Sequence, residues 1–249
     1  MQAIITLQQV TYRVGEAGIL DSLSLTLRRR EIVGILGLSG SGKTTLLRLI
    51  MGLIRPTAGE VVVFGKPASR LPEAQYDSLR LRMGMVFQYA ALFDSLTVGE
   101  NVAFPLREHR GMKGAALRDR VADLVGMVGM SGTEPMYPAQ LSGGMRKRVG
   151  IARALALAPE VMLYDEPSSG LDPLTAAMID DLIVRLRDSL GVASLVVSHH
   201  VANVLAIADG VGVVDQGRLA FWGSPAEARA SEVPIVKAFL RGRAEPVPA

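Results

Sequence analysis

The spacing of apolar residues divides the first third of the chain into strands and one helix. The segments IITLQQVTYR (4–13) and SLSLTLRR (22–29) are apolar at alternate positions, which predicts two antiparallel strands. The segment EIVGILG (31–37) is apolar on both faces, as expected of a parallel strand that is covered on both sides. The apolar segment TTLLRLIMGL (44–53) then predicts a buried helix.

The middle of the chain, from about residue 67 to residue 138, is more polar and predicts a helical insertion. One face of a helix is marked there by apolar residues at helical spacing, Leu117, Val121, Leu124, Val125 and Val128. Alternation of strands and helices resumes with VMLYDE (161–166) and ASLVVSH (193–199). The pattern predicts an α/β fold with a mixed sheet core, an antiparallel N-terminal subsheet and inserted helices.

Turn and cap residues mark the elements of the last third. Asp172 is a good N-cap, Pro173 suits the first helical position, and Gly191 suits the end of the same helix. The segment VGVVDQGRLAFWG (211–223) predicts two strands around a turn at 215–218. A final helix carries four apolar residues, Ile235, Val236, Phe239 and Leu240.

Composition narrows the class of protein. The chain has 249 residues, of which 49% are hydrophobic and none is cysteine, so it can bury a large core but forms no disulfide. Its basic clusters, 28–30 and 146–148, are not interleaved with aromatic residues, and the net charge is only +3, so we exclude nucleic acid as a partner. We find no internal repeat and no apolar run of the ~18 residues that a membrane span needs.

The glycine-rich stretch GLSGSGKT (37–44) predicts a phosphate-binding loop. It follows a buried strand and precedes a buried helix, so its backbone N–H groups and the helix dipole would face an anion. In such a loop Lys43 reaches the β- and γ-phosphates, and the Thr44 hydroxyl can ligate Mg²⁺.

Two other both-face-apolar strands end in polar residues, Asp165-Glu166 and Ser198-His199. The carboxyl ends of parallel strands share one edge of a sheet, so these groups should meet the glycine-rich loop. One carboxylate can hold Mg²⁺ and the other can deprotonate an attacking water, while His199 could touch the γ-phosphate. His200 and His109 have no comparable support, and we interpret them as surface residues.

The ordered motifs of the chain resemble those of the ATP-binding cassette (ABC) ATPases over essentially all 249 residues. They are VTYR (10–13), GLSGSGKT (37–44), MVFQ (85–88), LSGGM (141–145), VMLYDEP (161–167), SSGLD (168–172) and VSHH (197–200). The resemblance implies a P-loop NTPase cassette with a RecA-like core at about 1–87 and 150–225. It further implies a helical subdomain at about 88–149 and a C-terminal helix and tail at about 225–249.

The resemblance also implies roles for individual residues. Tyr12 would stack on adenine, although an aromatic residue in a strand is as often a packing residue. The phosphates of ATP would be wrapped by Ser39, Gly40, Ser41, Gly42, Lys43, Thr44 and Thr45. Mg²⁺ would be held by Thr44, Gln88 and Asp165, with Glu166 as general base and His199 at the γ-phosphate.

Family members dimerise head to tail with two ATP molecules between the subunits. The resemblance therefore implies that Ser142, Gly143 and Gly144 contact ATP on the other subunit, and that Asp172 faces the partner's site as well as capping its helix. The sequence agrees with this role, because the apolar spacing after residue 144 predicts a helix whose N-terminus could face an anion. The final helix packs on its own domain, or the extended tail AEPVPA (244–249) reaches across the dimer.

Within the family, LSGGM (141–145) and ALFDSLTVGENVAFPLREHR (91–110) resemble the ATPases of Mla-type phospholipid transporters. Met145 replaces the usual glutamine, outside the phosphate cradle, so we expect hydrolysis to be kept. The resemblance implies a peripheral protein at the cytoplasmic face of the inner membrane. Its expected partners are an integral membrane permease, an MCE-domain lipid-binding protein and a STAS-domain subunit. The alternatives are an importer, a lipoprotein exporter, or a non-transport ATPase of cell division or iron–sulfur assembly.

Overall fold

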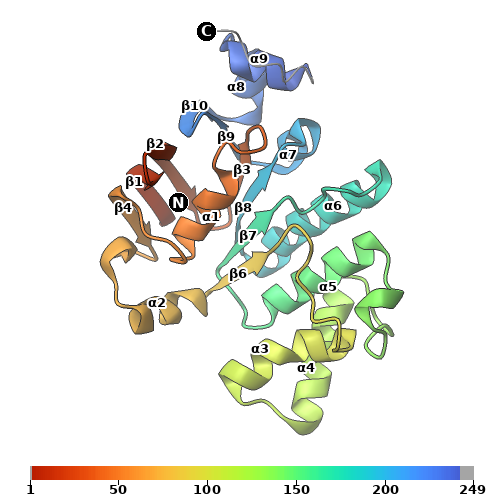
Figure 1. Ribbon diagram of the computed structural model, residues 1–249. Coiled ribbons are helices and arrows are strands. Elements are labelled where there is room, and N and C mark those ends of the chain that lie inside the picture. Colours follow the sequence, from red (N-terminus) through yellow and green to blue (C-terminus); the bar gives the residue numbers. More distant parts are fainter. Residues whose placement is uncertain (1, 242–249) are drawn as a thin grey trace.

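The computed structural model describes residues 2–241 and contains two β-sheets (Figure 1). A four-stranded antiparallel sheet has the order β2-β1-β4-β5, with strands β1 (Ala3–Val14), β2 (Ala17–Arg28), β4 (Ala58–Val63) and β5 (Lys66–Pro67). The pairing of β1 with β2 confirms the predicted antiparallel pair. Strands β4 and β5 were not predicted from the sequence.

The six-stranded sheet is mixed and forms the centre of the molecule. In the order β10-β9-β3-β8-β7-β6, its strands are β3 (Ile32–Leu36), β6 (Met83–Val86), β7 (Val161–Asp165), β8 (Ala193–Ser198), β9 (Gly210–Asp215) and β10 (Arg218–Gly223). All neighbouring pairs are parallel except β9–β10, which form a hairpin. Every residue of β3, β7 and β8 is buried, as their two-faced apolar pattern predicted.

Nine α-helices lie among the described residues. They are α1 (Lys43–Ile50), α2 (Glu73–Arg80), α3 (Val98–Arg110), α4 (Gly114–Met127), α5 (Gly143–Leu155), α6 (Pro173–Leu190), α7 (Val201–Ile207), α8 (Pro225–Ala230) and α9 (Pro234–Leu240), with short 3₁₀ turns η1 (Ala68–Arg70) and η2 (Pro138–Gln140). Asp172 and Gly191 delimit α6 as predicted, whereas α1 ends earlier than predicted, at Ile50, because Gly52 is left-handed (φ +64°). No helix within residues 2–241 combines the length and the apolar character needed to cross a bilayer.

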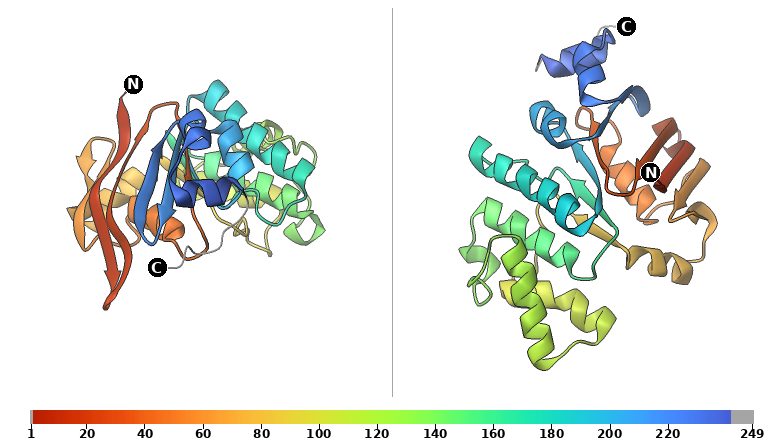
Figure 2. Two further views of the ribbon diagram at one scale, coloured as in Figure 1. Left: turned by 90° about the horizontal axis from the view of Figure 1, so that it is seen from above. Right: turned by 180° about the vertical axis from the view of Figure 1, so that it is seen from behind.

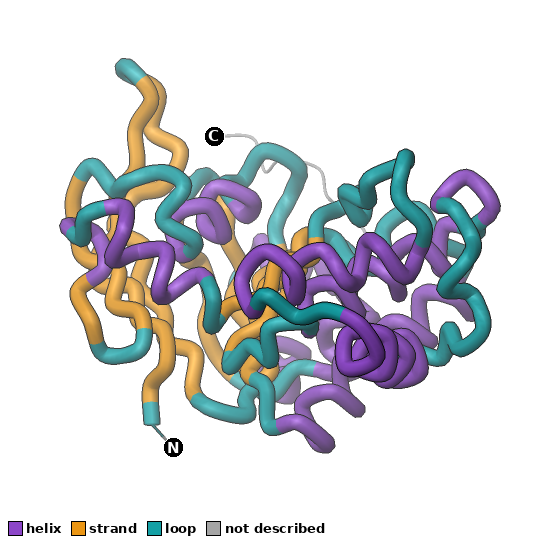
Figure 3. Tube along the Cα trace, turned by 90° about the horizontal axis from the view of Figure 1, so that it is seen from below, coloured by secondary structure: helices purple, strands orange, loops and turns teal. Residues whose placement is uncertain are grey.

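The elements form layers. Across Figure 1, the antiparallel sheet, α1, the six-stranded sheet and helices α5–α7 follow one another. The view from behind in Figure 2 agrees, with α3 and α4 at one end of the molecule and α8 and α9 at the other. Figure 3 shows the strands gathered in one part of the molecule, with short helices among them, and most of the helices in the other part. One apolar cluster fills the space around α1 between the sheets, and a second lies on the opposite face of the central sheet.

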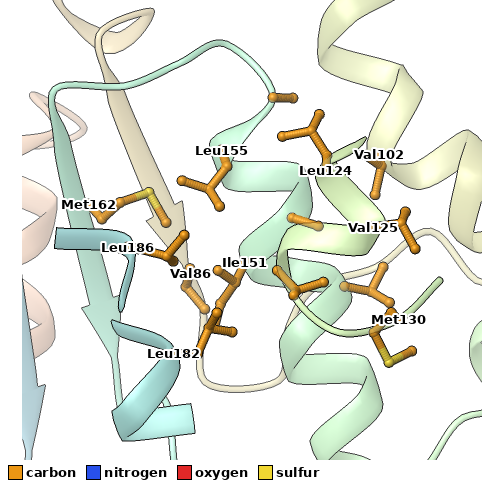
Figure 4. Close-up of a cluster of buried hydrophobic side chains, with 14 of the residues drawn as sticks. Val86, Val102, Leu124, Val125, Met130, Ile151, Leu155, Met162, Leu182 and Leu186 are labelled. Atoms are coloured by element: carbon orange, nitrogen blue, oxygen red, sulfur yellow. The ribbon is translucent and has the colours of Figure 1, made fainter. Parts of the chain in front are cut away.

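The inserted helices share the second cluster with the central sheet. Figure 4 shows α5 between α4 and the sheet, with Ile151 and Leu155 packed among Leu124, Met162 and Leu182. The predicted face of α4 is buried in this cluster. The expectation of an insertion over 67–138 was wrong at 83–86, because these residues form the edge strand β6. The predicted boundary between the helical subdomain and the second part of the core, at 149/150, falls within α5 and stays a prediction.

The C-terminal helix packs on its own chain. Val236 and Phe239 of α9 are buried against α7 and β9, and Ile235 and Leu240 lie at the edge of the same cluster. The final helix therefore packs on its own domain, while a tail that crosses the dimer stays a prediction. The tail 244–249, which could reach across a dimer, lies outside the described residues.

Candidate functional site

The structure brings three strand ends together, because β3, β8 and β7 are neighbours in the central sheet. A cavity of about 520 Å³ opens where they end. It is lined by Ile19, Leu38, Ser39, Gly40, Gly42, Lys43, Thr44, Thr45, Gln88, Glu166 and His199. Most of the residues predicted to hold ATP therefore surround one space at the carboxyl edge of the sheet, where ligands bind in open α/β sheets.

The loop between β3 and α1 is shaped to hold an anion. Gly40 and Gly42 adopt positive φ angles of +81° and +100°, which turn the backbone around the cavity. Helix α1 begins without a side-chain cap, so the positive end of its dipole is open to a ligand. The buried hydroxyl of Ser41 finds no hydrogen-bond partner within the described part of the chain. Ser41 lines a neighbouring hollow and not the main cavity, so it is the uncapped helix start that fits a bound phosphate.

Lys43 lies at the base of this loop with only 8% of its surface exposed. Its Nζ donates to the carbonyls of Gly37 at 2.8 Å and Leu38 at 2.9 Å, and it lies 4.0 Å from Oε1 of Glu166. Burial lowers the pKa of Lys43, and the carboxylates of Glu166 and Asp165 oppose that shift. The ammonium group is thus held between the loop and the carboxylate at the end of β7.

The expected magnesium ligands meet at the same edge. The Thr44 hydroxyl donates to Oδ1 of Asp165 at 3.1 Å; Thr44 and Gln88 line the cavity, whereas Asp165 is not among its lining residues. Burial raises the pKa of Asp165, while the hydrogen bond from Thr44 acts in the opposite direction. Residues 2–241 contain no cluster of three or more His, Cys, Asp or Glu side chains that could hold a metal alone. One carboxylate with neutral oxygen donors fits Mg²⁺ that is also bound by phosphates.

Glu166 is buried and its carboxylate is held from one side. Its Oε2 accepts hydrogen bonds from the Ser198 hydroxyl at 3.2 Å and the His199 N–H at 3.4 Å, and lies 2.9 Å from His199 Nδ1. The imidazole of His199 remains half exposed at the mouth of the cavity. A carboxylate that is fixed in this way, with its other oxygen facing Lys43, is suited to accept a proton from a water in the cavity.

His200 differs from the surface residue that we expected, whereas His109 is exposed as expected. The ring of His200 lies 4.1 Å from that of His199 and is partly buried. Burial lowers the pKa of His200, and the charge of His199 adds to the effect. Its backbone N–H donates to the Ser198 hydroxyl at 3.0 Å, so it supports the end of β8.

Tyr12 is not among the residues that line the cavity. It lies in β1, partly buried, and packs against the apolar cluster around α1. Ile19 of β2 lines the cavity instead. The structure thus gives Tyr12 a packing role, and the adenine contact stays a prediction.

A second helix start, that of α5, lies apart from the main cavity. Ser142 caps the helix by accepting a hydrogen bond from the Met145 N–H at 3.2 Å, and Gly143 lines a separate hollow of about 430 Å³. Asp172 caps α6 in the same way, through the Thr175 N–H at 3.0 Å. Within one chain these residues, together with Gly144, are not brought to the loop that carries Lys43.

Lys147 of α5 is a residue of the site that sequence reasoning missed. It is only 5% exposed, and its Nζ donates to the carbonyl oxygens of Gln88 and, at 2.9 Å, Glu166. The signal was present in the helical spacing, because Lys147 precedes the buried Ile151 and Leu155 by one and two turns.

The family model described as ABC transporter matches residues 20–169. The methionine import ATP-binding protein MetN of Geobacillus kaustophilus is 43% identical over 98% of this chain and 72% of its own length. The intermembrane phospholipid transport system ATP-binding protein MlaF of Escherichia coli K12 is 40% identical over 98% of this chain and 91% of its own length.

A solved structure has the same fold. It is a dimeric post-hydrolysis state of the ATP-binding cassette MJ0796 with ADP and Pi bound, and it superposes with a TM-score of 0.81 at 33% identity. The match covers 89% of this chain and 99% of that one. Family model, relatives and fold agree, and the chain belongs to the ABC transporter family.

Proposed function

We propose that the chain is the ATP-hydrolysing subunit of a transporter that moves phospholipids between the inner and outer membranes. The observation that carries hydrolysis is the convergence of Lys43, Thr44, Glu166 and His199 on one cavity, with Asp165 hydrogen-bonded to Thr44 behind its wall. The choice of phospholipid is supported by the similarity to MlaF over 91% of its length and by the motif LSGGM (141–145).

In the proposed mechanism the chain's own groups divide the work. The loop 37–42 and Lys43 bind the phosphates, Glu166 takes a proton from the attacking water, and His199 orients that water and the γ-phosphate. Mg²⁺, held by Thr44, Asp165 and Gln88, would neutralise charge on the phosphate oxygens. The matched dimer with ADP and Pi supports a second chain closing the site, with Ser142, Gly143, Gly144 and Asp172 facing its ATP.

A groove beside the Gln88 loop is the proposed docking site for a membrane permease. Phe87, Phe93 and Phe104 are 41–45% exposed and line a hollow of about 380 Å³. The rings of Phe93 and Phe104 lie 5.0 Å apart, and the groove continues to α5 through Arg153. Exposed aromatic clusters of this kind are typical of protein-binding surfaces. We propose that a segment of the permease fills this groove and so places the chain at the cytoplasmic face of the inner membrane, alongside the MCE-domain and STAS-domain subunits.

The test is purification of the tagged chain from detergent-solubilised membranes. We expect a multi-span protein to co-purify, with phospholipid enriched over bulk membrane when the complex is analysed by mass spectrometry. Recovery with a methionine-binding permease would favour the second candidate, an importer, which the 43% identity to MetN supports. Recovery without any membrane protein, from a strain that expresses the chain normally, would contradict a transport role.

A further inference from the structure

Helix α5 is fastened to the segment that carries Gln88, defined here as residues 87–91. The Arg153 guanidinium donates to the carbonyls of Ala90 at 2.9 Å and Ala91 at 2.7 Å. Gly150 lets the two backbones approach, because a Cβ built on it would lie 3.3 Å from that of Ala90. Lys147, one turn earlier on the same face, donates to the Gln88 carbonyl. Helix α5 and the 87–91 segment therefore form one unit.

Lys147 is also the link from this unit to the end of β7. Its Nζ donates to the Glu166 carbonyl at 2.9 Å. The backbone of Glu166 has a φ of +49°, a left-handed conformation that L-residues adopt only when their surroundings hold them there. The Glu166 N–H is bound to the Val197 carbonyl at 3.0 Å, so the peptide groups on both sides of its Cα are restrained.

We infer that Lys147 is a positioning residue for ATP hydrolysis, which holds Glu166 and the Gln88 segment in register with the start of α5. This inference rests on the proposed function. Lys147 is only 5% exposed, so its ammonium group must find acceptors within the protein, and both acceptors belong to segments that line the nucleotide cavity. Ser142 and Gly143 open the same helix about one turn before Lys147, so a second chain that binds there is connected to Glu166 through one side chain.

The hydrogen bonds of Lys147 predict which kinetic constant changes when its ammonium group is removed. Lys147 contacts backbone carbonyls and does not line the main cavity, so its loss should leave ATP binding nearly intact. The backbone of Glu166 would lose the restraint on its carbonyl, so its side chain could shift against Ser198 and His199, and a small displacement of a catalytic group costs large factors in rate. The effect is expected in kcat and not in KM.

The first test compares Lys147→Met with the wild-type full chain in its purified complex. Methionine fills similar volume without a donor. We expect kcat for ATP hydrolysis to fall at least tenfold, with KM for ATP and affinity for a fluorescent ATP analogue within threefold. A Lys147→Met variant with wild-type kcat would overturn the inference, as would a loss of ATP affinity equal to the loss of kcat.

Two further variants separate positioning from folding. Lys147→Gln keeps an amide that can donate to both carbonyls, and should recover at least a third of the wild-type kcat. Arg148→Met removes a charge at the next position, where the guanidinium contacts Gly129 at 3.4 Å, and should keep wild-type kcat. If Lys147→Gln is as slow as Lys147→Met at an equal thermal midpoint, the positioning role is wrong. Failure of the proposed function would differ, because the wild-type complex itself would then hydrolyse no ATP.

Discussion

Helices α1 and α5 begin in opposite ways. Helix α1 has no side-chain cap, follows Gly42 at a φ of +100°, and opens into the cavity beside Lys43. Helix α5 is capped by the hydroxyl of Ser142, which is exposed, and opens away from that cavity. The bodies of the two helices are alike, because each packs against one face of the central sheet.

Under the proposed function, one chain would hold a whole phosphate cradle and half of a second contact. The N–H groups at the start of α1 have no side-chain cap, whereas at the start of α5 the Met145 N–H is bonded to Ser142 of its own chain. A capped and exposed helix start still presents its dipole to a ligand that arrives with another molecule. The proposed head-to-tail dimer assigns such a ligand to it.

The largest expected effect concerns the chemistry at the α1 side. Glu166→Gln keeps size and hydrogen-bonding capacity but cannot take a proton, so hydrolysis should slow by about 10²–10⁴-fold. Because Lys43 and the loop are unchanged, ATP affinity should stay within a factor of about three, an amount below ~1 kcal/mol. Phosphate release and equilibrium binding of a fluorescent ATP analogue measure the two quantities. Near-normal turnover would remove Glu166 from the role of base.

The next largest effect concerns stability, and it tests whether α5 packs into the apolar core as tightly as α1 does. Ile151 is 0% exposed in the shared apolar cluster, so Ile151→Ala should lower the free energy of unfolding by about 2–5 kcal/mol. Calorimetry should then show a lower midpoint, by about 2–4 °C for each kcal/mol. Leu174→Ala on α6 is the control, since that side chain is 75% exposed. Equal midpoints for the two variants would mean that α5 is only loosely attached.

The two helix starts should respond differently to one added methyl group. Gly42→Ala forces a left-handed alanine, at a cost of about 1–2 kcal/mol. It also places a Cβ 2.6 Å from Leu20 Cδ2, so ATP affinity and stability should both fall. Gly143→Ala requires no positive φ and its Cβ would lie 3.3 Å from the Leu171 side chain, so the stability and the ATP affinity of the single chain should stay near wild type. ATP titrations and thermal melts of the two variants provide the test. Equal losses of affinity and stability in both would contradict the proposed difference between the two helix starts.

The smallest expected effect concerns the contact that Ser142 would make with a second chain. Ser142→Asp keeps the helix cap but adds a negative charge, so the stability and ATP affinity of the single chain should not change. ATP-dependent dimerisation in a Glu166→Gln background should weaken about tenfold, or ~1.4 kcal/mol, by repulsion of the partner's phosphates. Ser142→Asn, capped but neutral, is the control. The fraction of dimer is measured by light scattering at saturating Mg·ATP. Equal fractions for Ser142→Asp and Ser142→Asn would mean that Ser142 does not lie in the interface.

The strand ends of the site could be predicted, because a strand that is buried on both faces appears in the sequence as a continuous run of apolar residues. Strands β3, β7 and β8 are apolar throughout, so the polar residues that follow them had to gather at one edge. The face of α4 was predictable for a similar reason, since its apolar residues keep strict helical spacing. Strand β6, of only four residues, carries too short a pattern to be separated from the helices around it.

Contacts made by backbone atoms could not be predicted. The helical spacing of Lys147 indicates a buried position, but the carbonyl groups that it contacts have no sequence signature. His200 is partly buried because α7 begins there and turns its ring toward His199, a tertiary detail. The groove of Phe87, Phe93 and Phe104 depends on how α3 lies beside the Gln88 segment.

The strand order has a consequence for synthesis of the chain. The central strand β3 is bonded on one side to β8 and on the other to β9, whose residues follow it by more than 160 positions. While the ribosome is still translating the intervening helices, the apolar segment 32–36 has neither neighbour and exposes two unpaired edges. Such non-local pairing is slow to form and prone to aggregation. The nascent chain should therefore depend on chaperones until residue 215 has emerged.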